Sequence, residues 1–206
     1  MQNIVPVEER LADATLAGRR GQYAAEVRCL IDAAFAVMRT TGDIDPQVRD
    51  IVKAAGLSNQ AFYRHFASKD ALLLAVLADG QRQLVDYLRA RVESTNDPEL
   101  QLRLWIEGMF AQARNPQAAE ATRPFAINGA RLAERYPADL AATRAELLET
   151  LAPSVRALGG TDQDASFVCE LALSRMNSAI THRRNPQPHE VDRLVAFCLA
   201  GVRNGT

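Results

Sequence analysis

Apolar residues recur every three or four positions along almost the whole chain, which is the spacing expected of amphipathic α-helices. The clearest N-terminal example has charged residues at most of the intervening positions. Its apolar members are Tyr23, Ala24, Val27, Leu30, Ile31, Ala34, Phe35 and Met38. No segment alternates apolar and polar residues as a half-buried strand does, and no internal repeat is found. The pattern therefore predicts an all-α protein.

Three further helices are predicted after this first one. Asp45-Pro46 is a typical helix start, since Asp caps free N–H groups and Pro fits the first helical position. This helix has apolar residues on one face and ends at Gly56. Ser58 is the expected cap of a helix over residues 59–66, and Ser68 the expected cap of another that begins at Lys69.

Longer helices are predicted for the rest of the chain. Asp97-Pro98 begins one of them, and another runs from Pro137 to Leu158, where Gly159-Gly160 ends it. The last two extend over about 164–184 and 189–203, on either side of a proline-rich break. Together these helices predict a helical bundle larger than the N-terminal group.

The composition narrows the class of protein. With 48% hydrophobic residues and a net charge of −1, the chain has the balance of a globular protein rather than a disordered one. Its longest apolar run, residues 71–78, is too short to cross a bilayer, and the N-terminus lacks the pattern of a signal peptide. We therefore expect a cytoplasmic protein that does not enter a membrane.

No catalytic, cofactor or metal motif is found. The sequence lacks the nucleophile-elbow, dinucleotide and phosphate-loop patterns, and its three histidines do not have metal-ligand spacing. Cys29, Cys169 and Cys198 are far apart, so we expect three buried thiols rather than disulfides. The sequence thus predicts no enzyme activity, no cofactor and no metal site.

Two short helices joined across Gly56-Leu57 have the layout of a helix-turn-helix, in which the second helix enters the major groove of DNA. Asn and Gln amides suit adenine edges, Arg suits guanine, and a Tyr hydroxyl suits a phosphate. The expected inward positions are Ile51, Val52, Ala55, Leu57 and Phe62, and the expected outward positions are Asn59, Gln60, Tyr63 and Arg64.

The charge around this segment is a second indication of DNA binding. Lys69 occupies the first turn of a helix, where the helix dipole disfavours a cation but where a phosphate is readily held. Residues 51–69 contain three basic residues and no acidic one, although a solvated surface explains this as well. Residues 1–75 as a whole are neutral, so binding must depend on a local patch or on two copies of the chain. Arg19-Arg20 is either a flexible arm that reaches DNA or part of a solvated tail.

The run VRDIVKAAGLSNQAFYRHFASKDALLLAVL, residues 48–77, closely resembles the DNA-binding domain of tetracycline-repressor-like (TetR) transcriptional regulators. The resemblance extends over about Tyr23 to Leu77, and the remainder matches only in its all-α layout. It implies a flexible arm at 1–20, a three-helix DNA-binding domain at 21–67, and a helical ligand-binding and dimerisation domain at 68–206. It also implies a homodimer through the last two helices that binds a partly palindromic operator, as a repressor released by a small-molecule effector. The sequence does not distinguish a repressor from an activator of transcription.

The resemblance assigns roles to individual positions. Arg49, Asn59 and Gln60 match base-contacting positions, and Tyr63, His65 and Lys69 match phosphate-contacting ones. Many relatives have Thr where this chain has Val48, so one phosphate contact is not expected here. Ala61 offers only a methyl group, which suits contact with a thymine methyl.

Large apolar side chains in the second domain are candidates for an effector pocket, although residues of this type at helical spacing are more often plain core. They are Trp105, Met109, Phe110, Phe125, Phe167 and Met176. No set of polar groups identifies the effector. The alternative function is a helical interaction protein that keeps the helix-turn-helix but has lost DNA binding.

Overall fold

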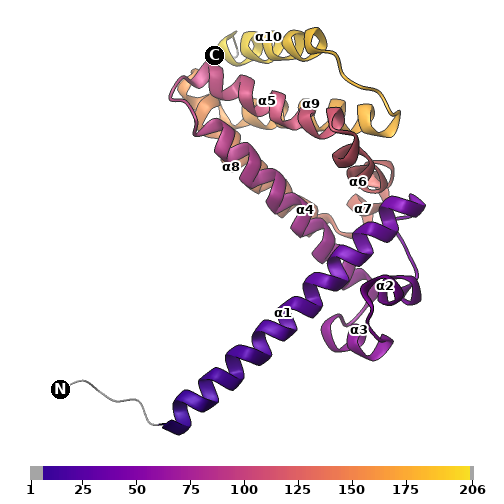
Figure 1. Cartoon of the computed structure of the whole chain (residues 1–206). Coiled ribbons are helices and arrows are strands. Elements are labelled where there is room, and N and C mark those ends of the chain that lie inside the picture. The colour runs from indigo at the N-terminus through magenta and orange to yellow at the C-terminus, as the bar shows by residue number, and fades with distance from the viewer. Residues whose placement is uncertain (1–6, 205–206) are drawn as a thin grey trace, which may run out of the picture. The chain divides into compact units, whose positions relative to one another are not determined.

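The computed structural model describes residues 7–204, which form ten helices and no strand (Figure 1). The prediction of an all-α fold is confirmed. The helices are α1 (Val7–Thr41), α2 (Val48–Ala55), α3 (Asn59–His65), α4 (Lys69–Val92), α5 (Pro98–Arg114), α6 (Pro116–Ile127), α7 (Gly129–Arg135), α8 (Pro137–Ala157), α9 (Asp162–Thr181) and α10 (Pro188–Asn204).

Two compact units make up the chain. Of the described residues, 7–37 and 45–76 form the N-terminal unit, and 38–44 and 77–204 form the C-terminal unit. The predicted domain boundary at 67/68 falls just before α4, whereas the first two turns of α4 belong to the N-terminal unit. Leu72 and Val76 are buried in those turns, which explains why this part of the helix belongs to a compact core.

Helix α1 begins sixteen residues earlier than the apolar pattern around Tyr23 suggested. The first six residues of the predicted flexible arm lie outside the described range, and residues 7–20 are helical. This segment is rich in Ala, Leu, Glu and Arg and contains no Pro, so its helix propensity is high even without an apolar stripe. A search for amphipathic faces misses such a helix, because residues 15–25 are all exposed.

The C-terminal unit is organised around α5, which contacts α6, α8, α9 and α10. Trp105 is fully buried, and its indole N–H donates a hydrogen bond of 2.9 Å to the hydroxyl of Thr150 on α8. The predicted helix starts at Pro98 and Pro137 are confirmed, and Thr161 and Asp164 form a capping box that begins α9. Among the described residues, no helix is long and apolar enough to cross a membrane.

Candidate nucleic-acid interface

The turn between α2 and α3 is defined by its backbone. Gly56 ends α2 with φ +66° and ψ 26°, a left-handed conformation that side chains disfavour. The N–H of Leu57 donates to the carbonyl of Val52 at 2.9 Å, which closes the turn in the manner of a Schellman motif. The glycine that ended the predicted helix is therefore required by the geometry of the turn.

Helix α3 is positioned by its cap and by its buried face. The Ser58 hydroxyl accepts a hydrogen bond of 3.1 Å from the N–H of Ala61, as the predicted cap requires. Phe62 is fully buried. On α2, Ile51 is also fully buried and Val52 is 7% exposed. Ala61 is only 6% exposed, so its burial does not favour the predicted contact of its methyl group with a thymine.

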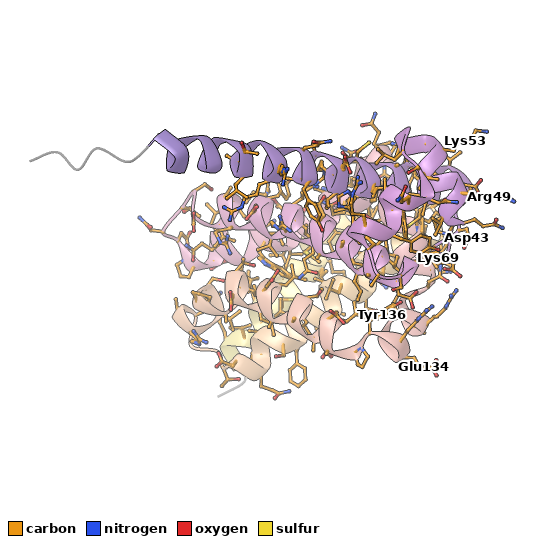
Figure 2. All side chains as sticks on the ribbon, turned by 90° about the horizontal axis from the view of Figure 1, so that it is seen from below. Asp43, Arg49, Lys53, Lys69, Glu134 and Tyr136 are labelled. Atoms are coloured by element: carbon orange, nitrogen blue, oxygen red, sulfur yellow. The ribbon has the colours of Figure 1, made fainter. Side chains whose placement is uncertain are left out.

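Four predicted DNA contacts lie on exposed surface. Asn59 and Gln60 are exposed in the first turn of α3, and Tyr63 is 61% exposed one turn further on. Arg49 on α2 projects from the ribbon, with its side chain 74% exposed (Figure 2). Two amides, a phenol and a guanidinium are thus available on two adjacent helices to groups outside the protein.

His65 is a second predicted DNA contact whose side chain is buried. Its side chain is only 1% exposed, and its Nε2 donates a hydrogen bond of 2.6 Å to Oε2 of Glu26 on α1. The ring also packs edge-on against Tyr23, with 4.3 Å between the ring centroids. His65 joins α3 to α1 inside the unit, an arrangement that does not favour the predicted phosphate contact through its side chain.

Arg64 and Lys69 are each paired with a carboxylate from an earlier part of the chain. Nη2 of Arg64 contacts the same Glu26 oxygen that binds His65, and Nζ of Lys69 lies 2.7 Å from Oδ1 of Asp45. Both pairs are partly exposed, so they remain open to exchange with another anion. Asp45 was predicted to cap α2, but α2 begins at Val48 and its N-cap residue is Gln47, whose side chain makes no cap hydrogen bond.

Glu26 is the residue that sequence reasoning missed. Hydrogen bonds from His65 and then from Arg64 lower the pKa of its carboxyl group, so it is ionised near neutral pH. It is one of the charged residues between the apolar positions of a predicted helix, and no spacing rule connects it to residues almost forty positions away. Only the packing of α1 against α3 brings these groups together.

The predicted effector residues are divided between core and surface. Trp105, Met109, Phe110 and Met176 are buried in the apolar core of the C-terminal unit, and Phe125 is half-buried. Phe167 is exposed on α9 and lines a surface hollow of about 380 Å³ together with Phe197 and Cys198 of α10. A second hollow, of about 310 Å³, is lined by Phe110 and by three arginines, Arg175, Arg184 and Arg193.

The cysteines are free thiols, but one of the three predictions about them is wrong. Cys169 and Cys198 are buried, and burial raises the pKa of each thiol to about 11. Cys29 is exposed on α1, with its Sγ 3.3 Å from the carbonyl oxygen of Ala55. Its place near the edge of the apolar stripe of α1 explains the difference.

The fold and surface of the N-terminal unit define a helix-turn-helix protein. Residues 30–76 match the family described as bacterial regulatory proteins, tetR family. The N-terminal unit is therefore similar to the DNA-binding unit of that family.

Curated relatives match part of the chain. The HTH-type transcriptional regulator BetI of Stenotrophomonas maltophilia is 37% identical over 82 residues, which are 39% of this chain and 42% of that protein. BetI of Brucella canis is 32% identical over 90 residues, 44% of this chain and 46% of the relative. The match thus spans less than half the length of these relatives.

Solved structures resemble the chain over a longer range. The fatty acid degradation regulator FadR from Bacillus halodurans aligns over 87% of this chain and 95% of its own, with a TM-score of 0.63 and 20% identity. A TetR family transcription regulator from Marinobacter aquaeolei aligns over 88% and 97%, with a TM-score of 0.63 and 16% identity. At such identities the likeness concerns the fold, and it extends the shared architecture to the C-terminal unit.

Proposed function

We propose that this protein is a DNA-binding transcriptional regulator that acts in the cytoplasm as a homodimer. The observation that carries the proposal is α3 itself. It is capped by Ser58, held from beneath by Phe62, and exposes Asn59, Gln60 and Tyr63 on the opposite side. A short helix with two exposed amides on its first turn suits the reading of base edges in a major groove.

The partner of this surface is double-stranded DNA. Asn59 and Gln60 are proposed to contact bases, as is Arg49 from α2, while Tyr63 contacts a phosphate. Lys69 contacts a phosphate after exchanging its ion pair with Asp45 for the DNA backbone. Because the unit is close to neutral in charge, a single copy binds weakly, and affinity depends on two copies acting together.

The last two helices are proposed to form the dimer interface. Phe197 of α10 is 69% exposed and Phe167 of α9 is 58% exposed, and both line the same hollow. Isolated exposed phenylalanines are common, but two on adjoining helices favour a self-complementary contact across a two-fold axis. Such a dimer presents two copies of α3 to successive major grooves, about 34–36 Å apart.

Repression released by a small-molecule effector is the proposed mode of regulation. An effector that binds the C-terminal unit lowers operator affinity only by its differential affinity for the DNA-bound and DNA-free states. Most of the pocket residues that the sequence predicts are buried in the core of the C-terminal unit. An effector can therefore bind among them only if this core opens. Candidate effectors are best found by screening for release of bound DNA.

Selection of bound duplexes from a random pool tests the function directly. A short, partly palindromic motif is expected, and replacing Asn59 or Gln60 by Ala is expected to cost ~1–3 kcal/mol and to relax preference at one position of each half-site. Replacing Lys69 by Ala is expected to weaken all duplexes alike and to reduce the salt slope by ~1. A protein that binds no duplex at low salt contradicts the proposal and leaves the helical interaction protein as the better explanation.

Light scattering tests the dimer. The wild-type chain is expected to have twice the mass of one chain, and Phe197→Glu is expected to shift it toward the monomer, because a buried charge at the interface is costly. Leu16→Glu is the matched control, since Leu16 is an exposed apolar residue on α1, in the other unit. Equal effects of the two changes, or no effect of F197E, would place the interface elsewhere.

A further inference from the structure

Glu26 of α1 makes two contacts with the end of α3 that differ in kind. Its Oε2 accepts hydrogen bonds from Nε2 of His65 and from Nη2 of Arg64, while Oε1 accepts one from Gln22 at 3.3 Å. The His65 side chain is 1% exposed, whereas that of Arg64 is 56% exposed. The contact with His65 is therefore part of the packing of the unit, and the contact with Arg64 is at its surface.

The exposed contact, between Glu26 and Arg64, is adjacent to the residues that are proposed to touch DNA. Arg64 directly follows Tyr63, and both project from the outer face of α3. A phosphate brought to that face meets a guanidinium whose charge is already balanced by a carboxylate. An exposed ion pair of this kind is weak, so a phosphate competes with Glu26 for Arg64.

We propose that Glu26 limits the affinity of α3 for DNA phosphates by holding Arg64. The inference rests on the proposed function. Sequence-independent affinity rises with each phosphate that a basic side chain neutralises. A carboxylate that occupies one such side chain, and that itself repels the backbone, lowers non-specific binding without altering the amides that read bases. The limit applies to every duplex alike, because a phosphate contact carries no sequence information.

The test compares two ion pairs that share helix α1. Glu26→Gln removes the charge at Arg64 but keeps an amide oxygen to accept from His65. Asp32→Asn is the matched control, because Asp32 pairs at 2.5 Å with Arg28, one turn away on α1 itself. Affinity for a random duplex and for the selected operator is measured over a range of salt concentrations for wild type, E26Q, D32N, R64Q and E26Q/R64Q.

E26Q is expected to bind the random duplex several-fold more tightly than wild type at low salt, with a salt slope steeper by ~0.9, as for one added phosphate contact. Operator affinity is expected to rise by a similar factor, because the added phosphate contact is available on every duplex. D32N is expected to have a smaller effect, and the gain is expected to disappear in E26Q/R64Q. This pattern would support the proposal.

Three results would overturn it: an unchanged slope in E26Q, a gain equal to that of D32N, or a gain that survives in E26Q/R64Q. Weaker binding to every duplex by a folded E26Q would also overturn it, since that is what a purely structural role predicts. If E26Q does not fold, R64Q decides the matter. With Glu26 left unpaired, R64Q is expected to lose more non-specific affinity than Arg28→Gln, and equal losses refute the inference. Failure of the wild type to bind any duplex would instead refute the proposed function.

Discussion

The two units of the chain differ in where their informative residues lie. In the N-terminal unit, polar side chains of defined chemistry are exposed on a seven-residue helix that buried apolar groups hold in place. In the C-terminal unit, the conspicuous aromatic and methionine residues are mostly inside a continuous core. The exposed residues of the first unit therefore indicate a function, whereas the conspicuous residues of the second unit indicate mainly how that unit is stabilised.

This difference has a physical origin. A helix-turn-helix is made by local rules, since a left-handed glycine, two hydroxyl caps and a few apolar positions define it within about twenty residues. An effector pocket is made by packing between helices that are distant in the sequence, and large apolar side chains fill a core as well as they line a cavity. The same residue type thus carries more functional information in the first unit than in the second.

The largest expected effect concerns the core of the C-terminal unit. Trp105→Ala is expected to lower the free energy of unfolding by ~3–5 kcal/mol, because it leaves a cavity in a fully buried site and removes the hydrogen bond to Thr150. Urea unfolding followed by far-ultraviolet circular dichroism measures the loss. Trp105→Phe, which keeps most of the apolar volume, is the control and is expected to lose less. A loss below ~1 kcal/mol for W105A would mean that this site is not core and would favour its prediction as part of a pocket.

A smaller effect is expected at the turn of the N-terminal unit. Gly56→Ala is expected to cost ~1–2 kcal/mol, since its φ of +66° is left-handed and a side chain is strained there. Gly21→Ala is the matched change in the middle of exposed α1, where added helix propensity is expected to stabilise the chain by ~0.5–1 kcal/mol. Thermal unfolding should show opposite signs. Two changes of the same sign would contradict the assigned turn.

The smallest expected effect is on the reactivity of the cysteine thiols toward a reagent, and it requires no change in stability. Cys29 is exposed, whereas burial raises the pKa of Cys169 and Cys198 to about 11 and leaves almost no thiolate at about pH 8. A thiol reagent such as Ellman's is therefore expected to modify one thiol per native chain quickly and all three after denaturation. Cys29→Ser removes the fast phase. Fast reaction of a second thiol would show that the packing of α9 or α10 is looser than the structure indicates.

Much of the candidate site was predictable from sequence, because the relevant signals are close together. Ser58, Gly56 and the exposed positions of Asn59, Gln60 and Tyr63 follow from caps and from the helical period. The family resemblance, not the helical period, suggested DNA contacts for Ala61 and His65, and a resemblance does not report burial. The burial of His65 depends on its contacts with Glu26 and Tyr23 of α1.

The sequence by itself determined the helical class, most helix ends, the helix-turn-helix and the residues that the recognition helix exposes, because caps, breakers and apolar spacing act over a few residues. Only the tertiary structure decided which charged groups meet. Glu26 with Arg64 and His65, and Asp45 with Lys69, are pairs made by helix packing between segments more than twenty residues apart. It also decided that most of the large apolar residues of the C-terminal unit are core. The physical reason is that local propensity depends on neighbours along the chain, whereas ion pairing and burial depend on neighbours in space.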